Sequence, residues 1–164
     1  MHLTIAPRDI LQIDDARITY RNFRGEKGEY NRNGERNFAL IIPNEEIKEA
    51  LINNKSADGA GWNVRIKPPY EDGDAPFMYL PVKVNFNDRG PAVYLISGNN
   101  RRRLYEEDVA RLDRISIAKV DLDIAPSDRI VQGVAYRTAY LRSIEVTQDL
   151  DRFEARWAEE REDY

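Results

Sequence analysis

The sequence predicts one mainly β domain, either a closed barrel or a sandwich, followed by a short helix at its C-terminal end. About seven short segments alternate between apolar and polar residues, in the manner of half-buried strands. Glycine, proline and asparagine separate these segments, and these residues are typical of turns. A chain of 164 residues, of which 41% are apolar, is long enough to bury one core.

Two scarce residue types exclude several kinds of functional site. The chain has no cysteine and a single histidine, His2. Disulfides, thiolate metal sites, cysteine nucleophiles and histidine-dependent catalysis are therefore not expected. No apolar run approaches the roughly 20 residues that span a bilayer, and the first ten residues lack the pattern of a secretion signal. We therefore expect a cytoplasmic binding protein that is not an enzyme, has no metal or cofactor and does not enter a membrane.

The first third of the chain predicts a long hairpin and a helix. Residues 10–20 and 36–42 alternate as strands, and the Asn33-Gly34 pair between them favours a tight turn. A helix is expected after Asn44, because an asparagine side chain at this position can accept a hydrogen bond from the first helical turn.

The middle of the chain predicts three more strands. They lie at residues 62–66, 78–86 and 92–96, and the second shows the clearest alternation. Pro81 lies inside this strand and has no backbone N–H to donate. The strand is therefore expected at a sheet edge or at a bulge.

The last third predicts two strand regions and a short helix. Residues 104–112 have helical apolar spacing, whereas residues 118–124 alternate as a strand that Pro126-Ser127-Asp128 is expected to end. Residues 131–146 predict one long strand or two. The segment before the helix is expected to form a turn that presents Arg101, Arg102 and Arg103.

Charge divides the chain into a neutral domain, residues 1–148, and an acidic tail, residues 149–164. The tail carries seven acidic residues and three arginines, so it accounts for the whole formal charge of −4. Its apolar residues have helical spacing, which makes it a candidate partner-binding segment. The candidate contact residues of the tail are Phe153, Trp157, Glu159, Glu160, Glu162, Asp163 and Tyr164.

Basic and aromatic residues alternate along the predicted hairpin. Arginine can contact phosphate, and aromatic rings can stack on unpaired bases, so this mixture suits single-stranded nucleic acid better than a duplex. Tyr20 and Phe38 could lie in the core, which makes Phe23 and Tyr30 the better candidates for stacking. The predicted nucleic-acid-binding residues are Arg17, Tyr20, Arg21, Phe23, Arg24, Lys27, Tyr30, Arg32 and Arg36, with Arg101, Arg102 and Arg103 at the rim.

The hairpin also resembles a known family. The segments Tyr20-Arg21-Asn22-Phe23-Arg24-Gly25-Glu26-Lys27-Gly28 and Tyr30-Asn31-Arg32-Asn33-Gly34-Glu35-Arg36-Asn37-Phe38 are similar to those of small bacteriophage proteins taken to bind single-stranded DNA. The resemblance extends over most of the body, through shorter segments. It implies an OB-like β-barrel and sequence-tolerant binding of unpaired DNA during phage replication or recombination, in the cytoplasm of the host cell. It further implies an acidic tail that competes with DNA or recruits phage or host proteins, and it leaves self-association open.

Two alternatives come from other functional classes. The first is a protein-interaction or virion-assembly module that uses the hairpin and the tail. The second is a magnesium-dependent nuclease, because Asp121 and Asp123 lie two residues apart on a strand and would face the same side. Most such pairs are solvent-facing strand residues, and no neighbouring residues complete a nuclease site.

Overall fold

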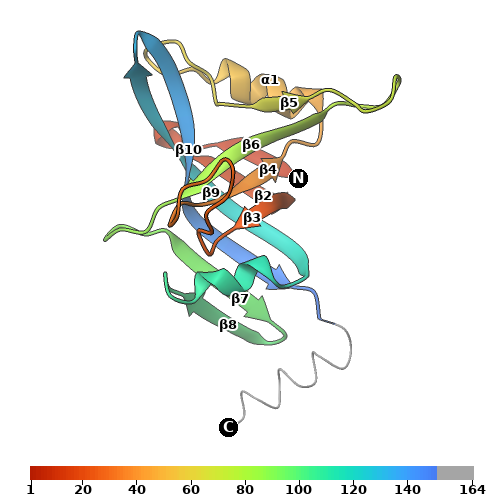
Figure 1. Ribbon diagram of the computed structural model, residues 1–164, viewed down its shortest axis with the longest axis vertical. Coiled ribbons are helices and arrows are strands. Elements are labelled where there is room, and N and C mark those ends of the chain that lie inside the picture. Colours follow the sequence, from red (N-terminus) through yellow and green to blue (C-terminus); the bar gives the residue numbers. More distant parts are fainter. Residues whose placement is uncertain (151–164) are drawn as a thin grey trace.

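A single bent strand closes the sheet into a barrel. In the computed structural model, which describes residues 1–150, β2 (Leu11–Ala16) and β3 (Ile18–Asn22) are separated only by Arg17. β2 pairs with β9 (Ile117–Val131), whereas β3 pairs with β4 (Arg36–Ile41). The strand order β2-β9-β10-β6-β4-β3 therefore returns to its starting point (Figure 1). The carbonyl oxygen of Arg17, at the bend, accepts a hydrogen bond from the backbone N–H of Ile41 at 2.9 Å.

The remaining elements extend or cover this barrel. α1 lies above β5 and β6, and the hairpin of β7 and β8 lies at the opposite end (Figure 1). No helix within residues 1–150 is long and apolar enough to cross a membrane. The other elements are β1 (His2–Ile5), η1 (Pro7–Asp9), α1 (Glu45–Asn53), β5 (Arg65–Lys67), β6 (Phe77–Val84), β7 (Ala92–Ser97), β8 (Asn100–Leu104), η2 (Val109–Asp113) and β10 (Val134–Gln148).

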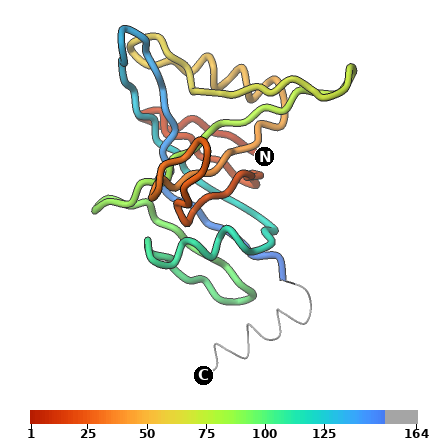
Figure 2. The backbone as a smooth tube through the Cα atoms, viewed as in Figure 1, coloured from red at the N-terminus to blue at the C-terminus, as the bar shows by residue number. Residues whose placement is uncertain are grey.

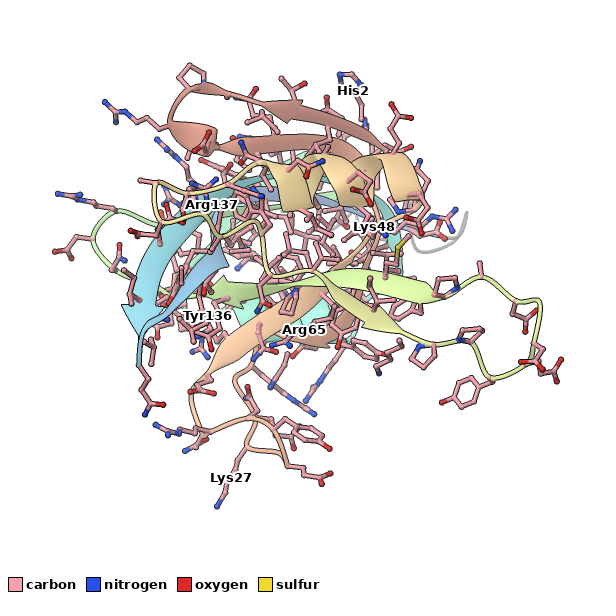
Figure 3. The ribbon with its side chains drawn as sticks, turned by 90° about the horizontal axis from the view of Figure 1, so that it is seen from above. His2, Lys27, Lys48, Arg65, Tyr136 and Arg137 are labelled. Atoms are coloured by element: carbon pink, nitrogen blue, oxygen red, sulfur yellow. The ribbon has the colours of Figure 1, made fainter. Side chains whose placement is uncertain are left out.

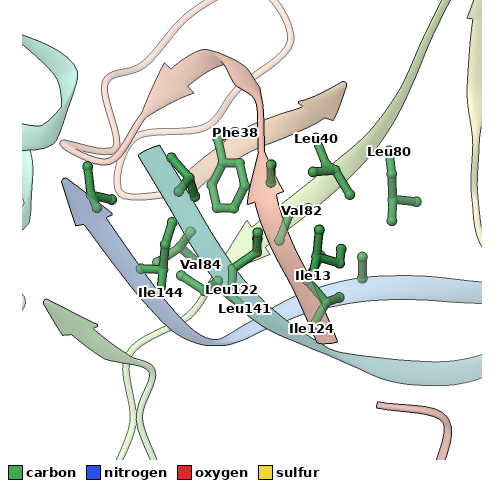
Figure 4. Packing of buried hydrophobic residues seen from close by; sticks show 14 of the residues in the cluster. Ile13, Phe38, Leu40, Leu80, Val82, Val84, Leu122, Ile124, Leu141 and Ile144 are labelled. Carbon is green, nitrogen blue, oxygen red and sulfur yellow. The ribbon is translucent and has the colours of Figure 1, made fainter. Parts of the chain in front are cut away.

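Strand alternation decides what fills the barrel. In β6, Leu80 and Val82 point inward and are fully buried, whereas Lys83 between Val82 and Val84 is exposed. Burying one such side chain contributes about 1.5–3 kcal/mol. Other strands contribute inward residues in the same way, so the core is continuous (Figure 4). The labelled core residues are Ile13, Phe38, Leu40, Leu80, Val82, Val84, Leu122, Ile124, Leu141 and Ile144.

Pro81 and Pro126 lie inside strands, and at both positions a neighbouring strand pairs with only one side of the backbone. Pro81 pairs with Ala39 of β4 on one side. On its other side the pairing with β5 stops at Tyr79 and the pairing with β10 starts at Val82. The strand is thus interior to the sheet but unpaired locally on one side, which a residue without an N–H tolerates.

The prediction that Pro126-Ser127-Asp128 ends a strand is wrong. β9 continues to Val131, and Pro126 pairs with Ala139 of β10. The pairing of β9 with β2 stops at Ile124, so Pro126 has a neighbour on one side only. Together, β9 and β10 form a ribbon that extends beyond the barrel.

Other predicted boundaries also change. Arg101–Arg103 belong to strand β8 instead of a turn. The short helix expected over residues 104–112 is present only toward its end, as the 3-10 helix η2. In the segment 62–66 only the last two residues join a strand, whereas Trp62 is buried and forms an isolated bridge with Arg137. The helix after Asn44 is confirmed, and the Asn44 side chain accepts a hydrogen bond from Ile47 N–H at 2.9 Å.

Arg137 joins four segments that cover one end of the barrel. Its guanidinium group donates to both carboxylate oxygens of Asp128, to Asp9 at 3.0 Å, and to the backbone and side-chain oxygens of Asn54. It also lies 5.4 Å from the ring centroid of Trp62. The carboxylate of Asp128 raises the pKa of Arg137 above its usual value, burial opposes this shift, and Asp9 adds to it. Arg137 is the one buried charged residue among residues 1–150 and lies near α1 (Figure 3).

Replacing Arg137 should destabilise the fold. Removing one partner of a buried ion pair costs about 3–5 kcal/mol, and we expect the lower figure because Asp9 and Asp128 are partly solvated. Arg137→Ala should therefore lower the free energy of unfolding by about 3 kcal/mol in urea denaturation. Arg129→Ala removes an exposed arginine from the same ribbon and should change it by less than about 0.5 kcal/mol. Equal effects of the two variants would contradict this role of Arg137.

Candidate nucleic-acid interface

Three aromatic rings form a cluster on the outer face of the barrel. Tyr20 of β3 contacts Phe77 and Tyr79 of β6 edge-on, with ring centroids 6.1 and 5.8 Å apart, and Phe77 stacks on Tyr79 at 5.5 Å. Tyr20 is 55% exposed. Its φ of 50° coincides with a register shift between Thr19 and Asn22, and a positive φ is uncommon for a non-glycine residue. Residues held in such conformations are frequent at binding sites.

A lysine completes this cluster. Lys67 of β5 places its Nζ atom 5.0 Å from the ring centroid of Tyr20 and 5.8 Å from that of Tyr79, and it donates a hydrogen bond to the Tyr20 hydroxyl at 3.2 Å. The hydrogen bond with Tyr20 raises the pKa of Lys67 above its ordinary value. The four side chains combine ring faces with a cation, as binding of single-stranded nucleic acid requires.

Further along β6, a cavity of about 250 Å³ separates the barrel from the loop between β3 and β4. Arg36 and Asn37 line it from β4, and Lys83 and Tyr140 line it from β6 and β10. The Lys83 amine lies 5.9 Å from the ring centroid of Tyr140. Lysine and aromatic side chains thus continue along the outer face beyond Tyr79.

The β3–β4 loop, residues 23–35, is held by asparagine side chains. Asn31 donates to the carbonyl oxygens of Glu26, Arg32 and Glu35, and its own oxygen accepts a hydrogen bond from Asn37 at 2.6 Å. Gly25 has a φ of +68°, and a Cβ atom there would lie 2.9 Å from the Arg36 guanidinium group. The asparagines and this glycine of the motif therefore shape the loop.

Phe23 does not lie where the sequence suggested. It is fully buried and stacks on Phe38, with ring centroids 5.3 Å apart. The carboxylate of Asp113 accepts hydrogen bonds from the N–H groups of Phe23 and Arg24, and this anchors the start of the loop to η2. The proposal that Phe23 stacks on DNA is therefore wrong, and Tyr20, considered for the core, is exposed instead.

The basic residues of the hairpin divide into two groups. Arg21 donates to the carbonyl oxygens of Leu112 and Ile115, so it ties β3 to the region of η2. Arg24 pairs with Glu26, and Arg36 lies 3.6 Å from Glu106. The others are exposed and form no ion pair within residues 1–150, and Lys27 projects from the loop (Figure 3). This second group consists of Arg17, Lys27 and Arg32, accompanied by Tyr30, which is 91% exposed.

The three arginines of β8 lie on a different element from the hairpin. The Arg101 guanidinium lies 3.8 Å from the ring centroid of Tyr94 and pairs with Glu145 at 3.2 Å. Arg101 also lines a cavity of about 240 Å³ whose other charged residues are acidic. A DNA contact by Arg101, Arg102 and Arg103 stays a prediction.

The two carboxylates of the nuclease alternative face the same side, as expected. Both line the acidic cavity beside Arg101. Asp121 accepts a hydrogen bond from Asp15 N–H and lies 3.6 Å from Lys119, and Asp123 accepts one from Ser143. Within the described part of the chain, no three acidic or histidine side chains are grouped as metal ligands would be.

Sequence reasoning missed five side chains of the outer face. Tyr79 and Lys83 were on the polar side of an alternating strand, which is the signal that could have identified them. Phe77 and Lys67 lie in the cluster because β5 pairs with β6, and this pairing has no signal in the sequence. Tyr140 faces outward because a register shift between Leu141 and Ser143 changes which residues of β10 point into the core.

The strand order defines a class of protein. Counting β2 and β3 as one strand, the barrel has the five-stranded Greek-key order of an OB-fold, whose second and third strands and adjoining loops bind oligonucleotides. Here those strands are β4 and β6, and the adjoining loop is the β3–β4 loop. A family model described as "Putative phage ssDNA-binding domain" matches residues 3–162. The chain belongs to this family.

Solved structures show the same fold. The single-stranded DNA-binding protein from bacteriophage Enc34 in complex with ssDNA aligns with a TM-score of 0.56 and 16% identity, over 92% of this chain and 93% of that chain. A C-terminal truncation of the Enc34 protein gives a TM-score of 0.54 and 15% identity over 91% of each chain. A search of curated proteins found no match.

Phe23 and Tyr30 should behave in opposite ways when truncated. Phe23→Ala should lower the free energy of unfolding by about 3–5 kcal/mol, because it empties a buried aromatic site. Tyr30→Ala should leave it within about 0.5 kcal/mol, because the ring is exposed. Urea denaturation measures both. A stable Phe23→Ala protein would show that the ring is not part of the core.

Proposed function

We propose that this chain binds single-stranded DNA across the outer face of β3, β4 and β6, between β5 and the β3–β4 loop. The observation that carries the proposal is the cluster of Tyr20, Phe77 and Tyr79 beside the Lys67 amine. Exposed rings accept stacked bases of any sequence, and the amine neutralises a neighbouring phosphate. Lys83, Tyr140 and the exposed cations of the loop extend the same path.

The geometry favours unpaired strands over duplexes. The rings stand on a strand surface, where they can meet bases whose faces are free. In a duplex those faces are already stacked. The one α-helix within residues 1–150, α1, carries three glutamates and a single lysine, so its charge does not suit a DNA groove lined by phosphates.

We further propose that the protein coats and protects exposed single strands during phage replication or recombination, in the host cytoplasm, and that it acts by binding instead of catalysis. Family membership supports this role. The tail residues Phe153 to Tyr164 lie outside the described residues. From their charge alone, we propose that they compete with DNA or recruit replication and recombination proteins.

A second candidate function rests on the ribbon of β9 and β10. Its tip exposes Ile130, Val131, Val134 and Tyr136, which are 44–59% accessible. The register places Val131, Val134 and Tyr136 on one face of the ribbon and Ile130 on the other. Exposed apolar groups that lie together are typical of protein contacts. This feature supports the interaction-module alternative or self-association. Sedimentation of the wild type and of Val131→Lys tests self-association, because a charge at the tip should reduce it.

Removing rings from the outer face should weaken DNA binding. A stacked base contributes about 1–3 kcal/mol, so Tyr20→Ala and Tyr79→Ala should each weaken oligo-dT binding by roughly 5- to 150-fold in fluorescence anisotropy. Tyr20→Phe keeps the ring and should bind within about threefold of the wild type. Tyr136→Ala is the matched control, because Tyr136 is 44% exposed and lies on the β9–β10 ribbon, outside this face.

The control variant shows whether a loss of affinity is specific to the outer face. Equal losses for Tyr136→Ala and Tyr20→Ala would remove the outer face from the binding site. Tighter binding to a duplex of the same length than to oligo-dT would contradict the preference for single strands.

Removing the acidic tail should strengthen DNA binding. A chain that ends at Gln148 loses the segment that carries the net negative charge, so we expect its affinity for oligo-dT to increase several-fold at low salt and to approach that of the full chain at high salt. Anisotropy titrations at two salt concentrations measure this. Unchanged affinity at low salt would contradict a competing role for the tail.

A further inference from the structure

A second cavity continues the path beyond the outer face. It has a volume of about 610 Å³ and lies between the end of β6, the 87–91 turn and the start of the β9–β10 ribbon. It shares Asn85 and Tyr140 with the cavity beside the β3–β4 loop. The two hollows therefore adjoin, and a strand that follows β6 reaches the second one directly.

The charge of this second cavity sets it apart. Arg8, Arg89 and Arg142 line it, and no carboxylate of residues 1–150 does. None of the three guanidinium groups forms an ion pair within residues 1–150. In a domain whose body is neutral, three unpaired cations around one hollow form a site for a polyanion. We call it the arginine groove.

Each of these arginines projects from a backbone irregularity. Arg142 lies at the register shift of β10. Arg89 lies in the tight turn from Asn87 to Gly90, where its N–H donates to the Asn87 side chain at 2.8 Å. Such irregularities commonly re-aim a side chain next to a functional site.

Arg8 is the most constrained of the three. Arg8 and Asp9 have φ values of 63° and 59°, which are uncommon for residues with a Cβ atom. Asp9 is held by Arg137 at 3.0 Å, and Ala6 N–H closes the turn onto the Ile10 carbonyl at 2.8 Å. The same turn therefore places Asp9 against Arg137 and Arg8 at the lining of the groove.

The outer face thus has two unlike ends. At the start of β6, residues 68–76 project as an arm that carries Glu71, Asp72 and Asp74 (Figure 2). At the end of β6 lies the arginine groove. A polyanion on the face is repelled at the first end and attracted at the second.

We propose that the arginine groove binds the sugar-phosphate backbone of the DNA segment that leaves the outer face at the end of β6. This inference rests on the proposed function and adds the direction of the path. Within the described part of the chain, the groove supplies charge and polar groups, among them Ser127, but only one aromatic ring, Tyr140. Its contacts are therefore with phosphates, whereas the cluster around Tyr20 holds bases.

Oligonucleotide length separates the two sites. One OB-fold covers about 4–16 nucleotides, so oligo-dT of about 5 nucleotides occupies the outer face and oligo-dT of about 20 nucleotides also reaches the groove. The double variant Arg8→Ala/Arg142→Ala, in the full chain, should bind the short strand within about twofold of the wild type. It should bind the long strand at least about tenfold more weakly, as expected for two lost charged hydrogen bonds. The salt dependence for the long strand should become shallower by about 1.4 in slope, at 0.7 per phosphate contact.

A matched variant controls for net charge. Lys48→Ala/Lys119→Ala also removes two cations, but both already pair with carboxylates. Its affinity for the long strand should therefore stay within about twofold of the wild type, and its salt slope within about 0.5. Circular dichroism melting checks that all variants fold.

Three results would be informative. A loss confined to the long strand supports the groove. The groove would be overturned if Arg8→Ala/Arg142→Ala matched the wild type in affinity and salt slope for both lengths. The proposed function would still stand if Tyr20→Ala weakened DNA binding in the same assay. Failure of the wild type to bind either strand would overturn both.

Discussion

Closure of the barrel at Arg17 is the constraint on which the rest of the structure depends. One strand must pair with β9 along its first half and with β4 along its second half, so the sheet has no free edge across the bend. Closure fixes an inside and an outside for every strand in the ring. The outside of β6 then faces the same side as Tyr20 of β3, and residues from distant parts of the chain become neighbours. The aromatic cluster is a product of this closure.

The motif that carries the family resemblance serves the fold more than the ligand. Phe23 and Phe38 stack in the core, and Asn31 and Asn37 hold the β3–β4 loop. A preformed loop loses little conformational entropy when a ligand arrives. The motif thus predicts binding correctly at the level of the family. Besides Tyr20 and the exposed loop residues, however, the side chains of the outer face, such as Lys67 and Tyr79, lie outside it.

Local periodicity was sufficient to predict the β class, most strands and the outward side of β6. It could not predict which strands pair, because pairing joins residues far apart in sequence, and it therefore missed the meeting of Tyr20, Lys67 and Tyr79. Backbone irregularities were a second source of error. The positive φ of Tyr20 and the register shift beside Arg142 reverse the direction that simple alternation assigns. The prolines misled for a related reason, since each lies where its strand has one neighbour.

The contact between β6 and β10 has a consequence for motion. It is a parallel pairing of only two residue pairs, Val82 with Ala139 and Lys83 with Tyr140, whereas β9 and β10 pair along almost their whole length. Since few residue pairs close this seam, we expect local opening of the barrel to occur there. A ligand that spans Lys83 and Tyr140 would bridge the seam and hold it shut. Occupancy of the DNA site and stability of the barrel are then coupled, because a bound ligand raises the free energy needed to separate β6 from β10.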